Sequence, residues 1–575
     1  MSPSNGPRLA PDPARLRGRS RFRFALVTLA CFAIAVAVAL APRMGAEAQV
    51  QASAEFDGAN CNVQIPGTWA SNSRLPDPFT RIDGTRITTR SQWECRRAEI
   101  KELAERTIYG DKPAPPSSVT GTVTSSRITV NVSDQGRSTS FSATVQLPSG
   151  SGPFPAVIVY GGFGADTDTI LSTGTAVINY DPGTVGAEGT SRNNKQGAFY
   201  SLYGASSSTG ILMAQAWGVS RLIDVIERSG GDILNNSTGV TGCSRYGKGA
   251  FVAGAFDQRV DLTMPIESGT GGVPAMRSIA QESGSQGLSS AYGEQPWLGD
   301  AFNSYTGNPN GLPVDTHQIV GMIAPRGLFI MENPHVEWLG ARSGHVAALG
   351  GAEIYKALGA GSNISYLSNT SNGTHCATRS EWQTPLRQSI QAFLHDNGNP
   401  PGTINAHPNK SGNLSQWRSW TTPTLTGGPG ETETPTEPTT DPPTTTPPPT
   451  GSTDLLQSVS TGKCVNLPNG NTADGTKVQL YTCAEDPSQQ FTYTADRELR
   501  VRGKCLDTYS GSNGTQVQIY ACHGGDNQKW TFGSDGTIRN AQYTNACLDV
   551  YSSSNGAPVQ VYACHGRNNQ QWLRV

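Results

Sequence analysis

The chain has 575 residues, among them 66 Gly and 38 Pro, and only 15% of its residues are charged. Globular proteins usually contain roughly 25% charged residues, so this composition is more typical of a loop-rich extracellular protein than of a helical cytosolic one. The length predicts several domains. The net charge is −2, from 43 basic and 45 acidic residues, and this lack of an overall basic excess argues against nucleic acid as a partner.

The first 48 residues predict a secretory signal peptide. Five Arg between positions 15 and 23 precede an apolar run at 24–41, and Ala46-Glu47-Ala48 provides a small-x-small cleavage site. This order is typical of a signal that is removed on export. The alternative is a membrane anchor, because the run is long enough to span a bilayer. We expect cleavage, a secreted extracellular protein and no membrane association afterwards.

The cysteine content agrees with export. Eleven Cys become ten if Cys31 leaves with the signal, and an even number suits an oxidising compartment. The sequence has neither a Cys-x-x-Cys pair nor a His-Glu-x-x-His motif. We therefore expect no zinc site and no other metal.

Residues 49–421 form the predicted large domain, in which strand-length apolar runs alternate with helical stretches. The runs lie at 154–162, 175–181, 262–268 and 326–333. Between them, residues 210–229 place aliphatic side chains at helical spacing. Because the runs lack polar alternation, they predict a sheet covered on both faces and hence an α/β fold.

Ser244 lies in the segment GVTGCSRYGKGA (239–250), between a short apolar lead and a small-residue helix start. The segment resembles a nucleophile elbow, a sharp strand-to-helix turn that leaves Ser Oγ free above the helix N-terminus. That N-terminus favours developing negative charge. The spacing is Gly-x-Ser-x-x-Gly, and the alternative is a Ser in an ordinary Gly-rich turn.

Two cysteines connect Ser244 with a histidine far along the chain. Ser244 follows Cys243, and His375 precedes Cys376. A disulfide holds two Cα atoms about 4.4–6.8 Å apart, so a bond between these cysteines would bring Ser244 and His375 together. An esterase needs a His near the Ser hydroxyl and a carboxylate that orients the His.

The large domain resembles the glucuronoyl esterases, which are α/β-hydrolase carbohydrate esterases of plant-cell-wall degraders. The resemblance covers most of 60–400 and rests on GCSRYGKGAF, PIESGTGG, GEQPWL, ENPHVEWLG and THC, which occur in this order. It implies a three-layer α/β sandwich with Ser244 as nucleophile, His375 as base and Glu267 as acid. It also implies that Arg245 stabilises the oxyanion through its N–H and its side chain. No cofactor is expected.

The resemblance implies further residues of the site. The family binds its glucuronoyl unit at positions that correspond here to Lys248, Gln286, Glu294 and Trp338. Some members place the acid one strand later, where this chain has Glu332 and Glu337, although we favour Glu267. Considered alone, Trp338 could also be a core aromatic. The implied disulfides are Cys61–Cys95 and Cys243–Cys376.

The implied activity is hydrolysis of the ester between 4-O-methyl-D-glucuronic acid side chains of glucuronoxylan and lignin alcohols. The alternatives are another secreted carbohydrate esterase, acting on acetylxylan or feruloyl esters, and a non-catalytic carbohydrate-binding protein. Lys248 favours the first, because a uronate pocket needs a cation and an acetyl or aromatic pocket does not. We expect a monomer whose partners are glucuronoxylan and lignin-carbohydrate esters.

Residues 422–452 are the predicted linker. Within it, 431–450 contain nine Thr and seven Pro, a composition that forms an extended spacer rather than a core. After it, residues 453–575 repeat one unit three times: Cys, then Val-Gln-aliphatic-Tyr-x-Cys, then Gln-x-aromatic. The first cysteines stand at 464, 505 and 547. The repetition predicts a pseudo-symmetric all-β domain.

This domain resembles the ricin-type β-trefoil lectin and carbohydrate-binding modules. The implied disulfides are Cys464–Cys483, Cys505–Cys522 and Cys547–Cys564. In this family a carboxylate bonds sugar hydroxyls while a ring stacks on the sugar face. The second repeat supplies Asp507, Tyr520, His523 and Asn527, the third supplies Asp549, Tyr562, His565 and Asn569, and the first has Asn466, Ala484 and Ser488 instead. We expect two working sites for xylan or galactose-type sugars. The alternative is that Tyr520 and Tyr562 only pack the trefoil.

Overall fold

The computed structural model describes residues 55–56, 61–426 and 453–574, apart from 485, 495, 534–535, 552–554 and 565–567. The predicted signal peptide, 1–48, and all but the first five residues of the predicted linker lie outside the described residues. Among the helices of the described part, none has the length and apolar character that a bilayer span requires.

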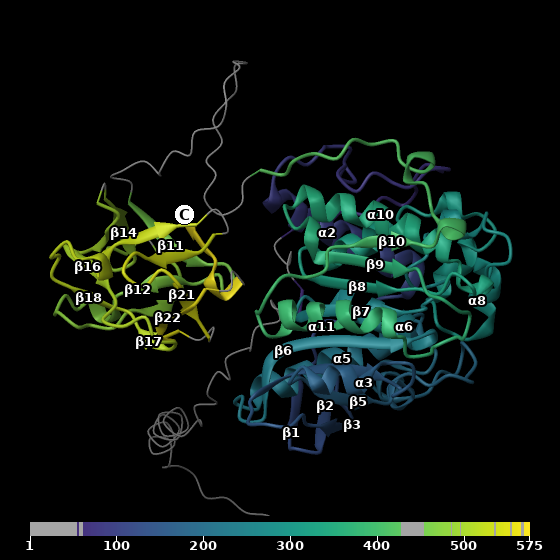
Figure 1. Ribbon diagram of the computed structural model, residues 1–575, viewed down its shortest axis with the longest axis horizontal. Coiled ribbons are helices and arrows are strands. Elements are labelled where there is room, and N and C mark those ends of the chain that lie inside the picture. The colour runs from purple at the N-terminus through teal and green to yellow at the C-terminus, as the bar shows by residue number, and fades with distance from the viewer. Residues whose placement is uncertain are drawn as a thin grey trace, which may run out of the picture. The chain divides into compact units, whose positions relative to one another are not determined.

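A ten-stranded sheet forms the frame of the larger domain (Figure 1). Its strands, in spatial order, are β1 (Ser118–Val123), β2 (Arg127–Asp134), β3 (Arg137–Gln146), β5 (Ala176–Tyr180), β4 (Phe154–Tyr160), β6 (Leu234–Cys243), β7 (Val260–Ile266), β8 (Gly327–Met331), β9 (Ile364–Ser368) and β10 (Ile404–Ala406). Pairing is antiparallel from β1 to β5 and parallel from β5 to β10. The carboxyl ends of β6, β7 and β8 therefore meet at one edge, where open α/β sheets bind ligands.

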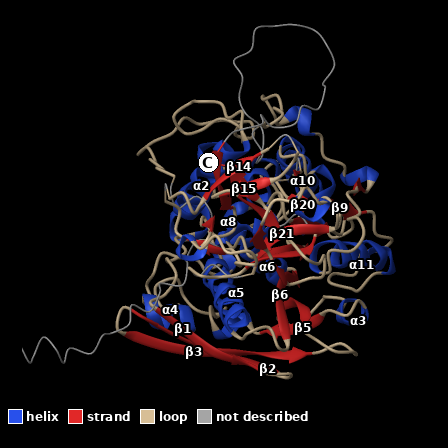
Figure 2. Ribbon diagram, turned by 90° about the vertical axis from the view of Figure 1, so that its left-hand side faces the viewer, coloured by secondary structure: helices blue, strands red, loops and turns tan. Residues whose placement is uncertain are grey.

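Helices cover both faces of this sheet. The α-helices described in this domain are α2 (Arg90–Ala104), α3 (Thr167–Ser172), α4 (Ala198–Tyr203), α5 (Ile211–Arg228), α6 (Arg245–Phe256), α7 (Met276–Ile279), α8 (Leu288–Glu294), α9 (Thr316–Ile323), α10 (Ala341–Ala357) and α11 (Ser380–Leu394). Figure 2 shows α3 and α11 on one side of the strands and α5 and α6 on the other. The predicted three-layer α/β arrangement is confirmed.

Strand β4 illustrates why the apolar runs lack polar alternation. Val157 and Val159 belong to the core beneath α3 and α11, whereas Ile158 and Tyr160 belong to the larger core on the opposite face. All seven residues of β4 are buried. The predicted helix at 210–229 is α5, whose residues are almost all buried because it packs against α6 and against β1, β2 and β6.

The smaller domain consists of short strands around a hydrophobic core of its own. They are β11 (Thr453–Ser458), β12 (Cys464–Asn466), β13 (Gln479–Tyr481), β14 (Gln490–Tyr493), β15 (Leu499–Val501), β16 (Lys504–Asp507), β17 (Thr515–Gln516), β18 (Gln518–Tyr520), β19 (Trp530–Phe532), β20 (Ile538–Asn540), β21 (Ala546–Val550), β22 (Val559–Ala563) and β23 (Trp572–Arg574). Matching positions of the three repeats share this core, as Val478, Val517 and Val559 do. The predicted β-trefoil is confirmed.

Five disulfides join the pairs that the two family resemblances imply. They are Cys61–Cys95, Cys243–Cys376, Cys464–Cys483, Cys505–Cys522 and Cys547–Cys564, with Cα separations from 5.0 to 5.8 Å. Each trefoil disulfide closes one repeat. Cys243–Cys376 instead joins the end of β6 to a loop 133 residues away.

Candidate active site

Ser244 stands in a sharp turn between β6 and α6. Its backbone has φ 59° and ψ −126°, and its N–H donates to Ile266 O at 2.9 Å. A side chain on Gly242 would lie 2.8 Å from Tyr246 O, and one on Gly247 would collide with Ile266 O. The glycines are therefore needed for the backbone to pass this closely. The turn has the geometry of a nucleophile elbow, with the Ser244 hydroxyl at the helix N-terminus.

Glu267 and His375 lie together at the ends of neighbouring segments. Glu267 follows β7 directly, and its N–H donates to Met331 O of β8 at 2.7 Å. Its fully buried carboxylate accepts from Cys376 N at 2.9 Å and lies 2.5 Å from His375 Nδ1. This contact fixes the ring and leaves His375 Nε2 facing away from the carboxylate, as a general base requires.

The Cys243–Cys376 disulfide holds Ser244 and His375 on neighbouring backbone segments. The Cα atoms of the two cysteines are 5.8 Å apart. Gly164, in the loop after β4, packs on this bond so closely that an added Cβ would lie 2.5 Å from Cys243 Cβ. Within the described residues no hydrogen bond yet joins Ser244 Oγ to His375, and such bonds often tighten only when substrate binds.

The acid that contacts His375 is Glu267 rather than either alternative one strand later. Glu332 is fully buried, with its Oε1 3.5 Å from Ser268 Oγ and its Oε2 without a hydrogen-bond partner. Burial, reinforced by the nearby Glu267, raises the pKa of Glu332 to about 8. Glu337 is exposed at the surface beside Gly284.

Arg245 and Lys248 place two cations next to Ser244, both near the ring of Trp297. Arg245 Nη1 lies 2.7 Å from Glu188 Oε2, and Trp297 Nε1 donates to the other oxygen of Glu188 at 2.6 Å. Lys248 is buried and donates from Nζ to Ser268 O at 2.5 Å. Burial lowers the pKa of Lys248 to about 8.

Three other predicted sugar contacts form one cluster at the rim. Gln286 Nε2 donates to Glu294 Oε2 at 2.7 Å, and Gln286 N donates to Trp338 O at 3.0 Å. Trp338 is 54% exposed and meets the His375 ring edge-on at 5.9 Å. It is not a core aromatic. The cluster joins the cations through Glu294, whose Oε1 is 3.8 Å from Arg245 Nη2.

The sequence reasoning missed Glu188 and Trp297. Glu188 lies in the polar loop after β5, and nothing local marks it as different from any other surface acid. Trp297 belongs to the stretch GEQPWL, so an aromatic ring within a matching stretch was the available signal. Together they hold the Arg245 guanidinium, which is therefore positioned by an ion pair rather than left free.

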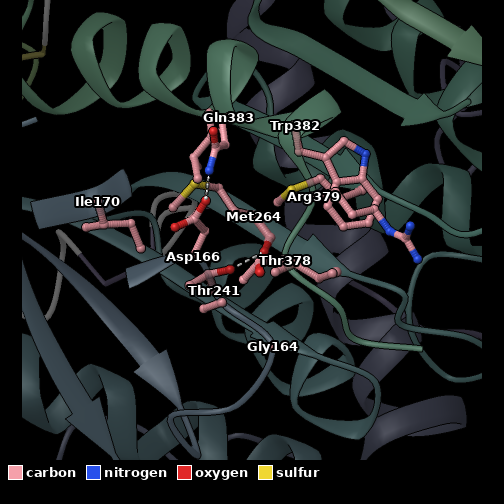
Figure 3. Close-up of a pocket in the computed structure, with 13 residues that line it drawn as sticks. Gly164, Asp166, Ile170, Thr241, Met264, Thr378, Arg379, Trp382 and Gln383 are labelled. Atoms are coloured by element: carbon pink, nitrogen blue, oxygen red, sulfur yellow. Dashed lines mark hydrogen bonds between the residues drawn. The ribbon is translucent and has the colours of Figure 1, made fainter. Parts of the chain in front are cut away.

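A small, mostly apolar cavity lies behind this site, on the α11 face of the sheet (Figure 3). Thr241, Met264 and Met331 line it from the strands, and Trp382 and Gln383 line it from α11. Of the described residues, those predicted to bind or act on substrate do not line it. The cavity is a packing feature behind the nucleophile strand rather than part of the substrate pocket.

The second and third trefoil repeats build the same polar cluster. Asp507 accepts hydrogen bonds from the side-chain amides of Gln518, Asn527 and Gln528, at 2.9, 2.7 and 3.0 Å. Asp549 accepts hydrogen bonds from the side-chain amides of Gln560, Asn569 and Gln570, at 2.8, 2.8 and 3.1 Å. His523 Nε2 lies 3.7 Å from Asp507, whereas His565 lies outside the described residues.

Exposed tyrosines surround these clusters. Tyr520 and Tyr562 are 42% and 39% exposed, which does not fit rings that only pack the core. Tyr481 of the first repeat is equally exposed, although Asn466, Ala484 and Ser488 replace the other site residues there. Two more tyrosines that the sequence reasoning missed, Tyr509 and Tyr551, each follow a site Asp by two residues and are still more exposed.

Two family models match this chain. The model for "Glucuronyl esterase, fungi" matches residues 130–359, and the model for the "Ricin-type beta-trefoil lectin domain" matches residues 452–572. The 4-O-methyl-glucuronoyl methylesterase of Hypocrea jecorina is 40% identical over 376 residues, which are 64% of this chain and 80% of that protein. The enzyme of the same name from Podospora anserina is 39% identical over 369 residues, 62% of this chain and 76% of that protein.

Solved structures agree. The glucuronoyl esterase catalytic domain of Hypocrea jecorina superposes with a TM-score of 0.59 at 38% identity, covering 63% of this chain and 100% of that one. A serine-to-alanine variant of the Sporotrichum thermophile glucuronoyl esterase was solved in complex with methyl 4-O-methyl-β-D-glucopyranuronate. It superposes with a TM-score of 0.60 at 36% identity and covers 64% of this chain and 100% of that one. This chain therefore belongs to the glucuronoyl esterase family and is a carboxylic ester hydrolase that carries a ricin-type β-trefoil lectin domain.

Proposed function

We propose that the protein hydrolyses esters of 4-O-methyl-D-glucuronic acid, using Ser244, His375 and Glu267 as its catalytic triad. The observation that carries this proposal is the contact of His375 Nδ1 with Glu267 Oε2, next to a serine in a nucleophile elbow. The activity itself is the one that the names of the relatives in Hypocrea jecorina and Podospora anserina give.

The reaction proceeds in two halves. His375 Nε2 takes the proton of Ser244 as its oxygen attacks the C6 carbonyl, and the departing alcohol receives that proton. The backbone N–H of Arg245, at the start of α6, faces the developing oxyanion, and the guanidinium held by Glu188 adds positive potential. Water then attacks the glucuronoyl-serine by the same route and releases the free acid.

The residues around Ser244 support a uronate as the acid part of the ester. Lys248 is a buried hydrogen-bond donor, and Glu294 and Gln286 offer further hydrogen-bonding groups, which suit the hydroxyls of a sugar acid and which an acetyl group would not require. Trp338 offers an exposed ring against which a sugar face can stack. We assign the natural ester to the bond between glucuronoxylan side chains and lignin alcohols, and the trefoil to anchoring on xylan.

The proposal includes secretion. Five disulfides occur in the described residues, and disulfides persist in oxidising environments such as the cell exterior. The expected signal peptide would provide the route.

A panel of three esters tests the proposed substrate. The wild-type chain is mixed with benzyl glucuronate, an acetylated xylo-oligosaccharide and a feruloylated one, and the released acid is quantified. We expect efficient release of glucuronic acid only. Preferential release of acetate or ferulate would replace the glucuronoyl assignment by acetylxylan or feruloyl esterase, and no release from any ester would favour a carbohydrate-binding protein without catalysis.

A further inference from the structure

One position in each trefoil repeat pairs through its backbone with a glutamine of the neighbouring repeat. It is the residue that directly precedes the Val-Gln pair. In the three cases its backbone pairs with the Gln of the adjacent site: Lys477 with Gln518, Gln516 with Gln560, and Pro558 with Gln479. The three positions are equivalent in structure and differ in chemistry. Only the second-repeat site receives a lysine at this position.

The Lys477 ammonium lies within the second-repeat cluster. Its Nζ is 2.9 Å from Gln518 Oε1, and the amide of the same glutamine donates to Asp507. Nζ also lies 4.5 Å from the centre of the Tyr509 ring, which is 62% exposed. The cation therefore borders both the carboxylate and an aromatic surface that a sugar ring can use.

Among the described residues, Lys477 forms no ion pair with a carboxylate, although Asp507 is close enough to favour its charged form. In the part of the chain that the structure describes, no acidic oxygen lies within ion-pair distance of its Nζ, whereas Lys504 and Lys529 of the same domain pair with Asp474 and Asp526. Asp507 is bound by side-chain amides instead. Partial burial lowers the pKa of Lys477, and the nearby Asp507 carboxylate acts in the opposite direction. An anion placed near the ammonium would therefore stabilise the charged form of Lys477.

We propose that the second-repeat site selects sugars that carry a carboxylate, with Lys477 as the residue that determines this specificity. The proposal rests on the sugar-binding role proposed above for the trefoil. Sugar hydroxyls bond the Asp507 cluster, a ring face stacks on an exposed tyrosine, and the carboxylate pairs with the ammonium. A glucuronoyl ester is uncharged at C6, whereas the free uronate is an anion. The site therefore favours xylan that already bears free uronates, including the product of the esterase.

Titration of the full-length chain tests this specificity. The ligands are a xylo-oligosaccharide with one 4-O-methylglucuronate branch, as the free acid, and the same backbone without the branch. The variant Lys477→Gln introduces the residue found at the equivalent position, Gln516. The control Lys463→Gln removes one charge from the same repeat. Binding of the branched ligand to the catalytic domain is common to all these proteins, so differences between them report the trefoil.

The preference is the affinity for the branched ligand divided by the affinity for the unbranched one. We expect it to be about threefold to fivefold larger in wild type and Lys463→Gln than in Lys477→Gln, which is the effect of a partly exposed ion pair. This excess should disappear at high salt, and Lys477→Gln should lose more affinity for the branched ligand than for the unbranched one. The reciprocal variant Gln516→Lys places a lysine beside Gln560 of the third repeat. It should raise the preference for the branched ligand above the wild-type value.

Two results would overturn the inference, and they are distinguishable. If Lys477→Gln keeps the full preference while the unbranched ligand still binds, the trefoil binds xylan without selecting uronates. If the trefoil variants Asp507→Ala and Lys477→Gln alter the binding of neither ligand, the proposed sugar binding at this repeat fails as well.

Discussion

Three non-glycine residues at the candidate active site have a positive φ. Ser244, Glu267 and Cys376 have φ values of 59°, 45° and 59°. Such conformations cost on the order of 1–3 kcal/mol each, and they persist only where the surroundings fix them. Here the backbone bonds of Ser244 to Ile266 and of Glu267 to Met331, together with the Cys243–Cys376 disulfide, do so. The strained residues are the proposed nucleophile, the proposed acid and the neighbour of the proposed base, His375.

The two buried acids Glu267 and Glu332 should respond differently to the same substitution. Glu267→Gln removes the charge that orients and stabilises His375, so kcat/KM for benzyl glucuronate should fall by about 10³–10⁴. Glu332→Gln should cost less than about tenfold, because a carboxyl with a pKa near 8 is already neutral at pH 7 and an amide resembles it. Steady-state kinetics of both variants at pH 7 provide the check. The reverse order would assign the acid to Glu332.

Glu332 should also make stability depend on pH. Its pKa rises from an ordinary value of 4.5 to about 8 on folding, so the folded state binds the proton more tightly. Its contribution to stability is therefore complete below about pH 4.5 and is lost as the pH rises through 8. Relative to Glu332→Gln, the Tm of wild type should decline between pH 5 and pH 8. A Tm difference that does not change with pH would mean that Glu332 is ionised throughout.

At the level of elements, the Cys243–Cys376 disulfide connects β6 to the loop that carries His375. Replacing both cysteines by Ala should destabilise the fold by about 2–5 kcal/mol and should also lower kcat, because the loop is no longer fixed beside Ser244. The matched control replaces Cys61 and Cys95, which lie before the sheet. We expect the control to lower Tm with little change in kcat. Equal kcat in both double variants would show that Glu267 alone positions His375.

The elements that the sequence predicted are those with a strong local signal. The strands β4, β5, β7 and β8 and the helix α5 consist of long apolar runs, because each is buried on both sides. The strands β1–β3, at one end of the sheet, were not predicted. Strand β1 is mostly exposed, β2 and the second half of β3 alternate buried residues with more exposed ones, and the three strands are rich in Ser and Thr, so their sequence resembles that of polar loops.

The site could be predicted only as far as a motif extends. Ser244, Glu267 and His375 stand in matching stretches, and the structure brings them together. Glu188 could not be found, because its role depends on an ion pair with a residue 57 positions away. Lys477 could not be found either, because the residues that it contacts belong to another repeat, and only the strand pairing brings them together.

For the whole molecule, the catalytic and trefoil domains have separate hydrophobic cores. A chain ending at residue 426 should therefore keep the full-length kcat/KM for soluble benzyl glucuronate. It should lose most binding to insoluble glucuronoxylan, because the proposed sites for anchoring on xylan belong to the trefoil. Pull-down on the polysaccharide, alongside kinetics on the soluble ester, measures both. Undiminished binding by the shortened chain would assign xylan recognition to the catalytic domain.

The most direct test of the account compares the full-length wild type with Ser244→Ala on benzyl glucuronate, following the release of glucuronic acid. A catalytic Ser that acts together with His375 and Glu267 predicts a fall in kcat of at least about 10⁴, with binding of the sugar part retained. Circular dichroism confirms that the variant is folded, which is expected because Ser244 is only partly buried. A variant that retains kcat within tenfold of wild type would contradict Ser244 as the nucleophile.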